Sequence, residues 1–390
     1  MEQERLKDKI RGCLMAGAAG DALGYEVEFM SRKAILSRFG KQGITKFALD
    51  NYGKALISDD TQMTLFTANG LLNAPHLSVQ TQYALARAYV DWYYTQIGAY
   101  KTKSKSCWLR DIDELYSRRA PGNTCMSALD AIARGESPFN NSKGCGGIMR
   151  VAPVALLEAN NVSKCKNVYP MNELAELGGC IAEITHQHPL GFLPASLLTV
   201  LIYKIVPMTA KQVQEDIDNI VAETLDILDV IYKDKYASDK HYLKELTEKA
   251  VQLARSDISD ADAIRQLGEG WVADETWAIA LYCAIRHIDS VEDAIIASVN
   301  HDGDSDSTGS VCGNIMGAIY GYEHIKNRNI FCPEGREFED TLELSEIILA
   351  LADDLSTGYI ISEYNSNDTP EKRQWYERYC EIKASGIGHK

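Results

Sequence analysis

The stretch Asn300-His301-Asp302-Gly303-Asp304-Ser305-Asp306-Ser307-Thr308-Gly309 organises what we expect of the rest of the chain. It packs three carboxylates and three hydroxyls into ten residues, directly after an apolar-rich run and before a run of small residues. Carboxylates at this density repel one another unless cations or strong hydrogen-bond donors lie among them. The carboxylates of Asp304 and Asp306 and the hydroxyl of Ser307 therefore predict a metal-binding segment.

A second oxygen-rich cluster, Ser58-Asp59-Asp60-Thr61, lies far upstream of the first. Oxygen ligands of this kind suit Mg²⁺, Mn²⁺ or Ca²⁺ better than Zn²⁺. One interpretation is that the two clusters meet and hold one or two hard cations in a single site. The alternative is that Ser58–Thr61 is simply the capped first turn of a helix. A cap alone explains Asn300–Gly309 less well, because a cap uses one or two acids and not three.

Length, composition and charge exclude several classes of protein. The 390 residues can bury a large core, and 45% hydrophobic with 24% charged residues is ordinary for a globular chain. A net charge of −15 gives no long-range field that would attract nucleic acid or an anionic membrane. The charged N-terminus does not resemble a signal peptide, and no run of about 18 apolar residues occurs. We therefore expect a cytoplasmic monomer with no membrane partner and no nucleic-acid partner.

The ten cysteines are scattered without CxxC pairs or zinc-ligand spacing, so we expect free thiols. Apolar residues recur with helical periodicity along the chain, and neither a strand pattern nor a low-complexity linker interrupts them. The sequence predicts one compact all-α domain over residues 1–360 and a C-terminal extension over 361–390. Helices are expected at 4–19, 61–72, 78–98, 125–134, 148–160, 172–185, 194–206, 211–232, 239–256, 260–267, 274–287, 291–299, 310–321 and 339–357. A turn at 20–24 is expected to end the first helix.

Glu28 is a candidate acid or base, because a carboxylate between Val27 and Phe29 suits a cleft better than an open surface. Two glycine-containing segments, Pro121–Thr124 and Gly144–Gly147, could bring backbone amides close to a phosphate. Either segment could equally be an ordinary loop.

Three further side chains invite an interpretation. His186 could cap a helix or form a hydrogen bond with a ligand, and the residues leave both roles open. Arg150 is interpreted as a structural ion-pair partner, and Trp271 as a core residue.

Six motifs occur in one order along the chain. They are Gly20-Asp21-Ala22-Leu23-Gly24 with Glu28, Ser58-Asp59-Asp60-Thr61, Gly146-Gly147-Ile148-Met149-Arg150, Thr185-His186-Gln187-His188-Pro189, Gly270-Trp271-Val272-Ala273 and Asn300–Ala318. This combination strongly resembles the ADP-ribosylglycohydrolase family, across roughly residues 5–322. The resemblance implies an all-α fold with a cleft that holds a binuclear Mg²⁺ centre, in which Mn²⁺ can substitute.

The resemblance also implies roles for individual residues, carried over position by position. The implied metal ligands are Ser58, Asp59, Asp60, Asp304, Asp306 and Ser307. The implied contacts to the diphosphate and adenosine are Gly122, Asn123, Thr124, Gly146, Gly147, Met149 and His186. Glu28, Asp60 and Asp304 are the implied catalytic residues, with Glu28 as general base or as a stabiliser of positive charge, and Asp21 supports the ligands. Asp302 stands where glycine is common, which would add negative charge near the metals, and Ser307 stands where threonine is common.

By this resemblance the chain hydrolyses the bond between ADP-ribose and an acceptor and releases ADP-ribose. The substrate would be an ADP-ribosylated protein or a small ADP-ribose conjugate, and the sequence does not decide the linkage. Two alternatives stay open. One is a non-catalytic ADP-ribose-binding or structural protein on the same scaffold. The other is a two-metal phosphoesterase, because two-metal sites also cleave phosphate bonds.

Overall fold

Helices make up the regular structure of the computed structural model, which describes residues 2–74, 79–99, 105–164, 169–357 and 369–379. Within these ranges no β-sheet forms, and the strand-like contacts are two isolated bridges, Ala55 with Leu342 and Gly144 with Val272. The prediction of an all-α fold is confirmed.

The α-helices are α1 (Glu2–Tyr25), α2 (Arg32–Phe39), α3 (Asp59–Asn73), α4 (Val79–Gln96), α5 (Asn123–Ala133), α6 (Ala152–Ser163), α7 (Met171–Glu183), α8 (Pro189–Ile205), α9 (Ala210–Val230), α10 (Ala237–Ala254), α11 (Asp260–Leu267), α12 (Ala273–Arg286), α13 (Val291–Val299), α14 (Ser305–Tyr320), α15 (Tyr322–Asn327), α16 (Phe338–Thr341), α17 (Ser345–Thr357) and α18 (Pro370–Tyr379). Three 3₁₀ helices are η1 (Trp108–Asp111), η2 (Asp113–Tyr116) and η3 (Cys145–Arg150).

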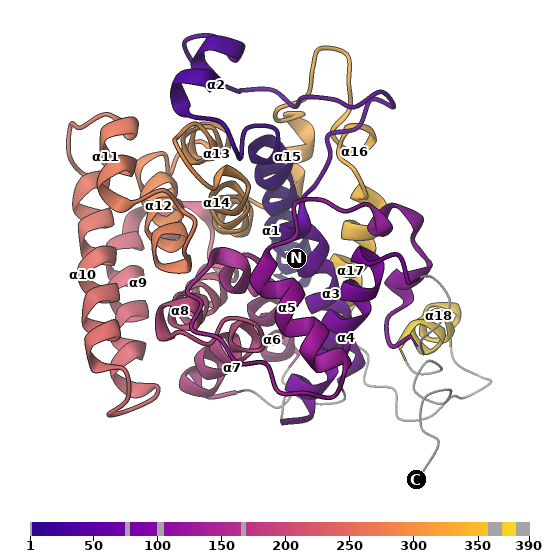
Figure 1. The fold of residues 1–390 in the computed structure, drawn as a ribbon. Helices are drawn as coiled ribbons and strands as arrows, with labels where there is room; N and C mark the ends of the chain where they lie inside the picture. Colours follow the sequence, from indigo (N-terminus) through magenta and orange to yellow (C-terminus); the bar gives the residue numbers. More distant parts are fainter. Residues whose placement is uncertain (1, 75–78, 100–104, 165–168, 358–368, 380–390) are drawn as a thin grey trace.

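Helices α1 and α14 pack against each other at the centre of the bundle (Figure 1). Their backbones approach so closely that only glycine fits at the contacts. A Cβ atom on Gly20 would lie 2.0 Å from the carbonyl oxygen of Gly309, and one on Gly24 would lie 2.2 Å from that of Ser305. The turn predicted at 20–24 is therefore wrong: α1 continues to Tyr25, because these glycines serve helix packing and not chain reversal.

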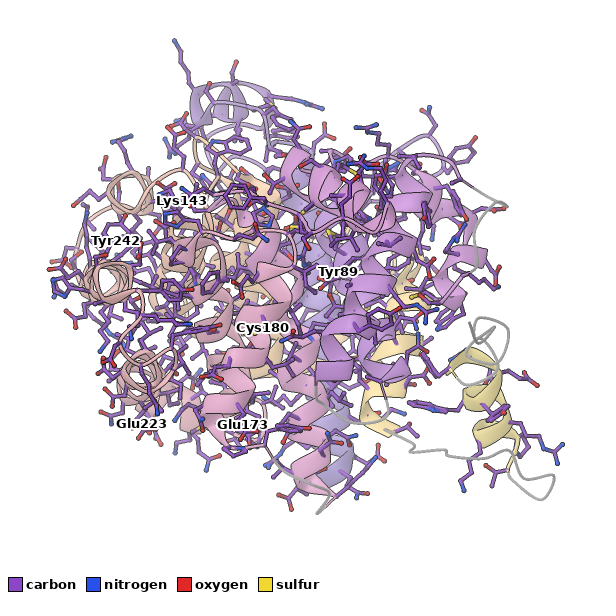
Figure 2. The ribbon with its side chains drawn as sticks, turned by 60° about the horizontal axis from the view of Figure 1, so that its bottom comes forward. Tyr89, Lys143, Glu173, Cys180, Glu223 and Tyr242 are labelled. Carbon is purple, nitrogen blue, oxygen red and sulfur yellow. The ribbon has the colours of Figure 1, made fainter. Side chains whose placement is uncertain are left out.

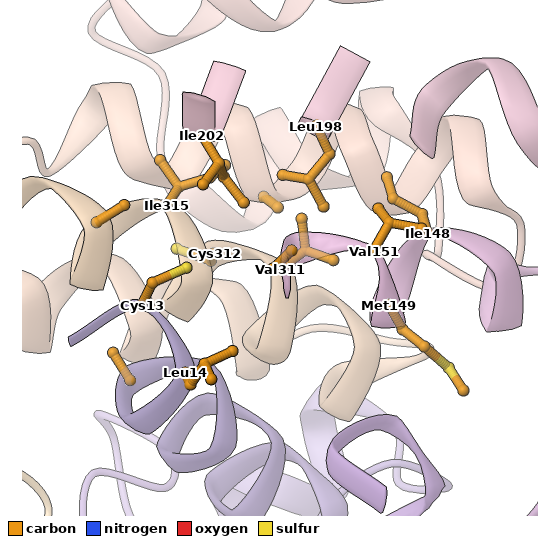
Figure 3. Close-up of a cluster of buried hydrophobic side chains, with 14 of the residues drawn as sticks. Cys13, Leu14, Ile148, Met149, Val151, Leu198, Ile202, Val311, Cys312 and Ile315 are labelled. Atoms are coloured by element: carbon orange, nitrogen blue, oxygen red, sulfur yellow. The ribbon is translucent and has the colours of Figure 1, made fainter. Parts of the chain in front are cut away.

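A cluster of buried side chains fixes the centre against its neighbours (Figure 3). Its labelled members are Cys13 and Leu14 of α1, Ile148 and Met149 of η3, Val151 after it, Leu198 and Ile202 of α8, and Val311, Cys312 and Ile315 of α14. Each buried aliphatic side chain of this size contributes about 1.5–3 kcal/mol to folding. The cluster therefore holds η3 and the first turns of α14 together, and both elements carry candidate site residues.

Two helix starts near the site differ from those expected. Helix α14 begins at Ser305 and not at 310, because the side chain of Asp304 caps it by accepting a hydrogen bond from the Ser307 amide. Helix α8 begins at Pro189 and contains Pro194, which the sequence had suggested as its start. Proline is tolerated there because buried residues on either side, Phe192 and Leu197 among them, hold the helix in the core.

The C-terminal helix α18 packs at the edge of the bundle (Figure 1). The hydroxyl of Tyr379 donates to Asp354 of α17 over 2.7 Å, and Trp375 is buried. Residues 361–368 and 380–390 lie outside the described ranges, so the boundary at 360 stays a prediction.

Two expectations about the whole chain can be examined in the described residues. The eight cysteines described are free thiols, while Cys165 and Cys380 fall outside the description. None of the helices described is both long enough and apolar enough to cross a membrane.

Candidate active site

The two acidic segments meet at the floor of a cavity of about 700 Å³. Ser58 caps α3 and Asp304 caps α14, so both clusters are helix N-termini. The hydroxyl of Ser307 donates a hydrogen bond to Oδ1 of Asp60 over 3.2 Å, across 247 residues of sequence. The capping interpretation and the meeting of the two clusters therefore both hold for these residues.

The carboxylate of Asp21 in α1 holds the start of α3 in place through hydrogen bonds. Its carboxylate accepts hydrogen bonds from the Ser58 amide at 3.0 and 3.1 Å, from the Thr61 amide at 3.1 Å, and from the Thr61 hydroxyl. Asp21 is completely buried between Gly20 and Gly24, the glycines that pack on α14. Asp21 thus ties α3 to the central helix pair, and its support of metal ligands stays a prediction.

Burial dominates the electrostatics of the cluster. It raises the pKa of Asp21 and of Asp304 to about 6. Burial, and after it the charge of Asp306, raises the pKa of Asp59 and of Asp60 well above the usual range. The pKa of Asp306 is also raised, first by burial and then by Asp304. The cluster is therefore rich in acceptor oxygens that repel one another, the condition that a bound cation relieves.

The carboxylates are gathered but do not yet form a coordination shell. Oδ2 of Asp60 is buried without a hydrogen-bond partner. Among the residues described, no group of three or more His, Cys, Asp or Glu side chains has an arrangement that could hold a metal ion. Ser58 is buried behind the cavity wall, where its hydroxyl accepts a hydrogen bond from the Asp60 amide. Any cation would therefore require some of these side chains to rotate.

Glu28 lies beside the cluster, shortly after the end of α1, and lines the cavity. Only 8% of the residue is exposed, and its Oε2 atom has no hydrogen-bond partner. Burial raises its pKa to about 10, and the charges of Asp306 and Asp59 add to the shift. This carboxyl group has the unusual setting that the sequence suggested for an acid or base.

Trp271 forms part of the cavity wall, so the prediction that it belongs to the core is wrong. The side chain is 39% exposed, and its ring stacks on Phe29 with centroids 6.0 Å apart and planes 22° apart. Positive φ angles at Gly268 and Gly270 turn the chain just before it, which places Trp271 at the surface. An aromatic residue directly after a glycine turn was the signal that could have revealed it.

Another part of the cavity wall comes from the glycine-containing segments. Asp59 accepts a hydrogen bond from the Gly122 amide over 3.2 Å, and Asn123 begins α5 without a side-chain cap. Gly122, Asn123 and Thr124 line the cavity, as do Gly146, Met149 and His186. Gly147 is the exception among the predicted substrate contacts, because it packs behind the wall against Ala182 and the Gly191 carbonyl.

His186 and His188 have different roles. His188 caps α8 by accepting a hydrogen bond from the Leu190 amide over 3.0 Å. His186 lines the cavity and pairs through Nδ1 with the Thr185 hydroxyl over 2.9 Å. Burial, with a smaller effect of Arg150, lowers the pKa of His186 to about 3, so its ring is neutral. His186 is therefore the histidine that can contact a ligand.

Arg150 is structural, but not as the ion-pair partner that we expected. In the described part of the chain its partners include the Ile181 carbonyl at 3.2 Å, the Thr185 hydroxyl at 2.7 Å, and the sulfur atoms of Met63 and Cys125 at 3.4 and 3.6 Å. The guanidinium carbon also lies 4.3 Å from the centroid of the Tyr89 ring. Figure 2 labels Tyr89. The Thr185 hydroxyl also forms a hydrogen bond with Nδ1 of His186. Arg150 therefore holds His186 in the cavity wall through Thr185.

The sequence did not indicate the positions of two residues near the cluster, Cys145 and Asp302. The thiol of Cys145 donates a hydrogen bond to Oδ2 of Asp304 over 2.8 Å. The scattered cysteines gave no sign of this, although a cysteine among the glycines of 144–147 could have raised the question. Asp302 lies outside the cavity and accepts a hydrogen bond from the Arg32 amide over 2.7 Å, so the expected extra charge near the metals is absent from the cavity lining.

The sequence pattern of the ADP-ribosylglycohydrolase family matches residues 2–360. The chain belongs to the ADP-ribosylglycohydrolase family. The family predicted from the ordered motifs is thereby confirmed. A solved structure described as an ADP-ribosylglycohydrolase-related protein complex shares the fold, with a TM-score of 0.57 and 22% identity, covering 91% of this chain and 99% of that one.

Three relatives in this family are similar at low identity. The ADP-ribosyl-[dinitrogen reductase] glycohydrolase of Rhodospirillum rubrum is 23% identical over 82% of this chain and 87% of its own length. The ADP-ribosylarginine hydrolase Tri1 of Serratia proteamaculans is 24% identical over 83% of this chain and 74% of its own. The ADP-ribosylhydrolase ARH3 of Mus musculus is 25% identical over 55% of this chain, and the match spans 59% of the mouse protein.

Proposed function

We propose that this chain hydrolyses the glycosidic bond between ADP-ribose and an acceptor and releases ADP-ribose. The acceptor would be a protein side chain or a small molecule. Membership of the ADP-ribosylglycohydrolase family supports the reaction, and relatives are named as hydrolases of ADP-ribosyl groups. The observation that carries the proposal is the hydrogen bond between Ser307 and Asp60, which closes the two acidic segments at the cavity floor.

The donor set fits hard divalent cations. Asp59, Asp60, Asp304, Asp306 and Ser307 line the cavity with oxygen atoms, and Oδ2 of Asp60 is unpartnered. These residues would hold two Mg²⁺ ions, with Mn²⁺ as a substitute, and Ser58 would join them if its hydroxyl released the Asp60 amide. Bound there, the cations would supply charge stabilisation and orientation for a water molecule and for the hydroxyls of the distal ribose.

Glu28 supplies the proton chemistry in this proposal. A water molecule attacks the anomeric carbon as the bond to the acceptor breaks through an oxocarbenium-like transition state. Oε2 of Glu28 is buried at the cavity and unpartnered. Without cations, burial and the neighbouring carboxylates raise the pKa of Glu28 to about 10, so the group holds its proton. Cations bound beside it would lower this pKa, and the resulting carboxylate would accept the proton of that water and stabilise the positive charge that develops on the sugar.

The glycine-containing part of the wall binds the rest of ADP-ribose. The N-terminus of α5 presents backbone amides at Asn123 and Thr124, and the positive end of the helix dipole favours a diphosphate. Side chains on Gly144 or Gly146 would press on His186, since a Cβ on Gly146 would lie 2.9 Å from its Cε1 atom. These glycines therefore keep the neutral His186 ring open to a hydrogen bond with the nucleoside.

A panel of defined ADP-ribosyl linkages tests the function. The purified chain is incubated with ADP-ribosyl-arginine, ADP-ribosyl-serine and O-acetyl-ADP-ribose peptides or conjugates, in Mg²⁺, Mn²⁺ or EDTA. We expect free ADP-ribose from at least one substrate, with the reaction abolished by EDTA. Release of AMP would identify a phosphoesterase instead, and ADP-ribose binding without any product would identify a non-catalytic binder.

A further inference from the structure

A chain of hydrogen bonds runs from the buried Arg150 to His186 in the cavity wall. A terminal nitrogen of Arg150 donates to the Thr185 hydroxyl over 2.7 Å, and that hydroxyl pairs with Nδ1 of His186 over 2.9 Å. Arg150 and Thr185 are fully buried, and His186 is 2% exposed. Of the three residues, His186 is the one that lines the cavity. The chain therefore connects a buried positive charge to a ring that a ligand can contact.

The guanidinium group sets the direction of these hydrogen bonds. It carries donors only, so the Thr185 hydroxyl oxygen must accept from it, and the hydroxyl proton is left to donate elsewhere. The thiol of Cys125 also pairs with this hydroxyl. Its sulfur is a weak acceptor, however, and it already accepts from the other terminal nitrogen of Arg150 over 3.6 Å. Nδ1 of His186 is the stronger acceptor, so we expect the hydroxyl proton to point to it.

The direction of this hydrogen bond decides which ring nitrogen of His186 carries the proton. Burial, and after it the charge of Arg150, lowers the pKa of His186 to about 3, so the ring is neutral and has a single N–H. An Nδ1 atom that accepts a hydrogen bond leaves this proton on Nε2.

Nε2 of His186 lies at the glycine-containing part of the cavity wall. A Cβ on Gly144 would lie 3.2 Å from it, and one on Gly146 would lie 3.4 Å from it. Among the residues that the structure describes, the hydrogen bond of the ring is the one through Nδ1. The Nε2–H group is therefore available to a ligand in the cavity.

We propose that Thr185 is a positioning residue that makes His186 a hydrogen-bond donor to the ligand. Held as an acceptor by Arg150, Thr185 selects the ring tautomer that has its proton on Nε2. The ligand atom that meets this nitrogen must then be an acceptor, such as a diphosphate oxygen or an unprotonated ring nitrogen of the base. The tautomer itself needs no ligand, whereas the contact with ADP-ribose rests on the proposed function.

Nitrogen NMR of the histidine ring tests the tautomer directly. Full-length, ligand-free protein is labelled in its eight histidines, and the His186 signals are identified by their absence from His186→Gln. We expect a protonated Nε2 and an unprotonated Nδ1 in the wild type and in Thr185→Ser, which keeps the hydroxyl. Thr185→Val removes the hydroxyl and should give a mixture of the two tautomers. A wild-type ring protonated at Nδ1, or a tautomer that Thr185→Val leaves unchanged, overturns the proposal.

Binding of ADP-ribose, measured by calorimetry in Mg²⁺, tests the consequence for the ligand. We expect Thr185→Val to weaken binding by about tenfold, because the buried Nδ1 loses its donor, and Thr185→Ser to bind as the wild type does. Equal affinity in Thr185→Val and the wild type overturns the positioning role.

Thr224→Val is the matched control for the loss of a buried hydroxyl. Thr224 is also fully buried, but its hydroxyl donates to the Ile220 carbonyl within α9 over 2.7 Å, away from the cavity lining. This variant should keep the wild-type tautomer and the wild-type affinity. Thermal melts of each variant confirm that it is folded.

The outcomes separate this inference from the hydrolase proposal. Release of ADP-ribose by a protein whose His186 ring is protonated at Nδ1 overturns the positioning role alone. A ring protonated at Nε2 through Thr185, in a protein that binds ADP-ribose but releases none from any conjugate, supports the positioning role and overturns the hydrolase proposal alone.

Discussion

The outer helix α9 and the central helix α14 differ in which of their faces are buried and in the residues that fill them. α9 buries one face, through Val213, Ile217 and Leu228 among others, and is capped by Thr209 in a reciprocal capping box. α14 is buried on every side from Ser305 to Ile319 and consists largely of small and polar residues. Figure 1 shows α9 at the side of the bundle and α14 beside α1 near its centre.

This difference separates stability from function within one fold. The outer helices follow the amphipathic pattern, in which apolar burial stabilises and polar residues face water. The centre instead buries carboxylates whose pKa values are raised by burial, and it packs glycine backbones to bring them together. Such an arrangement lowers stability unless a ligand compensates for it. The predictions below test this contrast between an outer region built for stability and a centre built for binding.

Replacing the carboxyl group at Glu28 should have the largest effect of all. We expect Glu28→Gln to lower kcat by about 10²- to 10⁴-fold, because it removes a proton acceptor at the cavity. KM should change little, since the amide keeps the shape of the side chain. The measurement is steady-state release of ADP-ribose, with the peripheral Glu223→Gln as the control that keeps wild-type rates (Figure 2 labels Glu223). A Glu28→Gln rate close to wild type would remove Glu28 from the chemistry.

Adding a methyl group at the contact between α1 and α14 should lower the free energy of unfolding more than removing a methyl group from the exposed face of α9. Gly20→Ala should lower the free energy of unfolding by about 3 kcal/mol or more, because its Cβ collides with the α14 backbone. The matched change on the exposed face of α9, Ala222→Gly, should cost about 1 kcal/mol. Urea denaturation of both variants measures the difference. Equal losses would contradict the close packing of α1 on α14.

Removing divalent cations should make the centre sensitive to pH. A carboxyl group whose pKa is higher in the folded than in the unfolded state stabilises the fold at low pH, and this stability is lost as pH rises between the two values. For Asp21 and Asp304 that interval runs from 3.8 to about 6, and the other cluster carboxyls extend it upward. EDTA-treated protein should therefore melt about 5 °C or more lower at pH 8 than at pH 5. Added Mg²⁺ should abolish this decrease, and a melting temperature that rises with pH in EDTA would contradict the burial of these groups.

The smallest effect should come from an outer ion pair. Lys204 and Glu223 lie 2.6 Å apart, with the Glu223 side chain 65% exposed. Glu223→Ala should therefore change the free energy of unfolding by no more than about 0.5 kcal/mol. A larger loss, measured by the same urea titration, would show that the outer helices depend on charge as well as on apolar burial.

The same contrast explains how much could be predicted from the sequence. The outer helices were predicted to within a few residues, for example 211–232 against Ala210–Val230, because one-sided burial leaves a periodic pattern. In the centre the pattern fails: Gly20 and Gly24 were interpreted as a turn because nothing local reveals that another backbone lies against them.

The candidate site was partly predictable for a related reason. Asp59, Asp60, Asp304 and Asp306 stand out because buried acids in clusters are rare. Cys145 and Trp271 do not stand out in this way, since their places depend on tertiary contacts with Asp304 and Phe29. The glycines beside each of them are the signal that the sequence offers.

Manganese binding followed by electron paramagnetic resonance tests the central claim most directly, because it reports on the meeting of the two acidic segments without relying on turnover. EDTA-stripped wild-type protein, Asp60→Asn and Asp304→Asn are titrated with Mn²⁺, and the signal of free Mn²⁺ is measured. We expect wild type to bind Mn²⁺ and each single substitution, one on each segment, to weaken binding by about tenfold or more while the circular dichroism spectrum stays helical. Undiminished Mn²⁺ binding in either folded variant would contradict a cation site shared between the two segments.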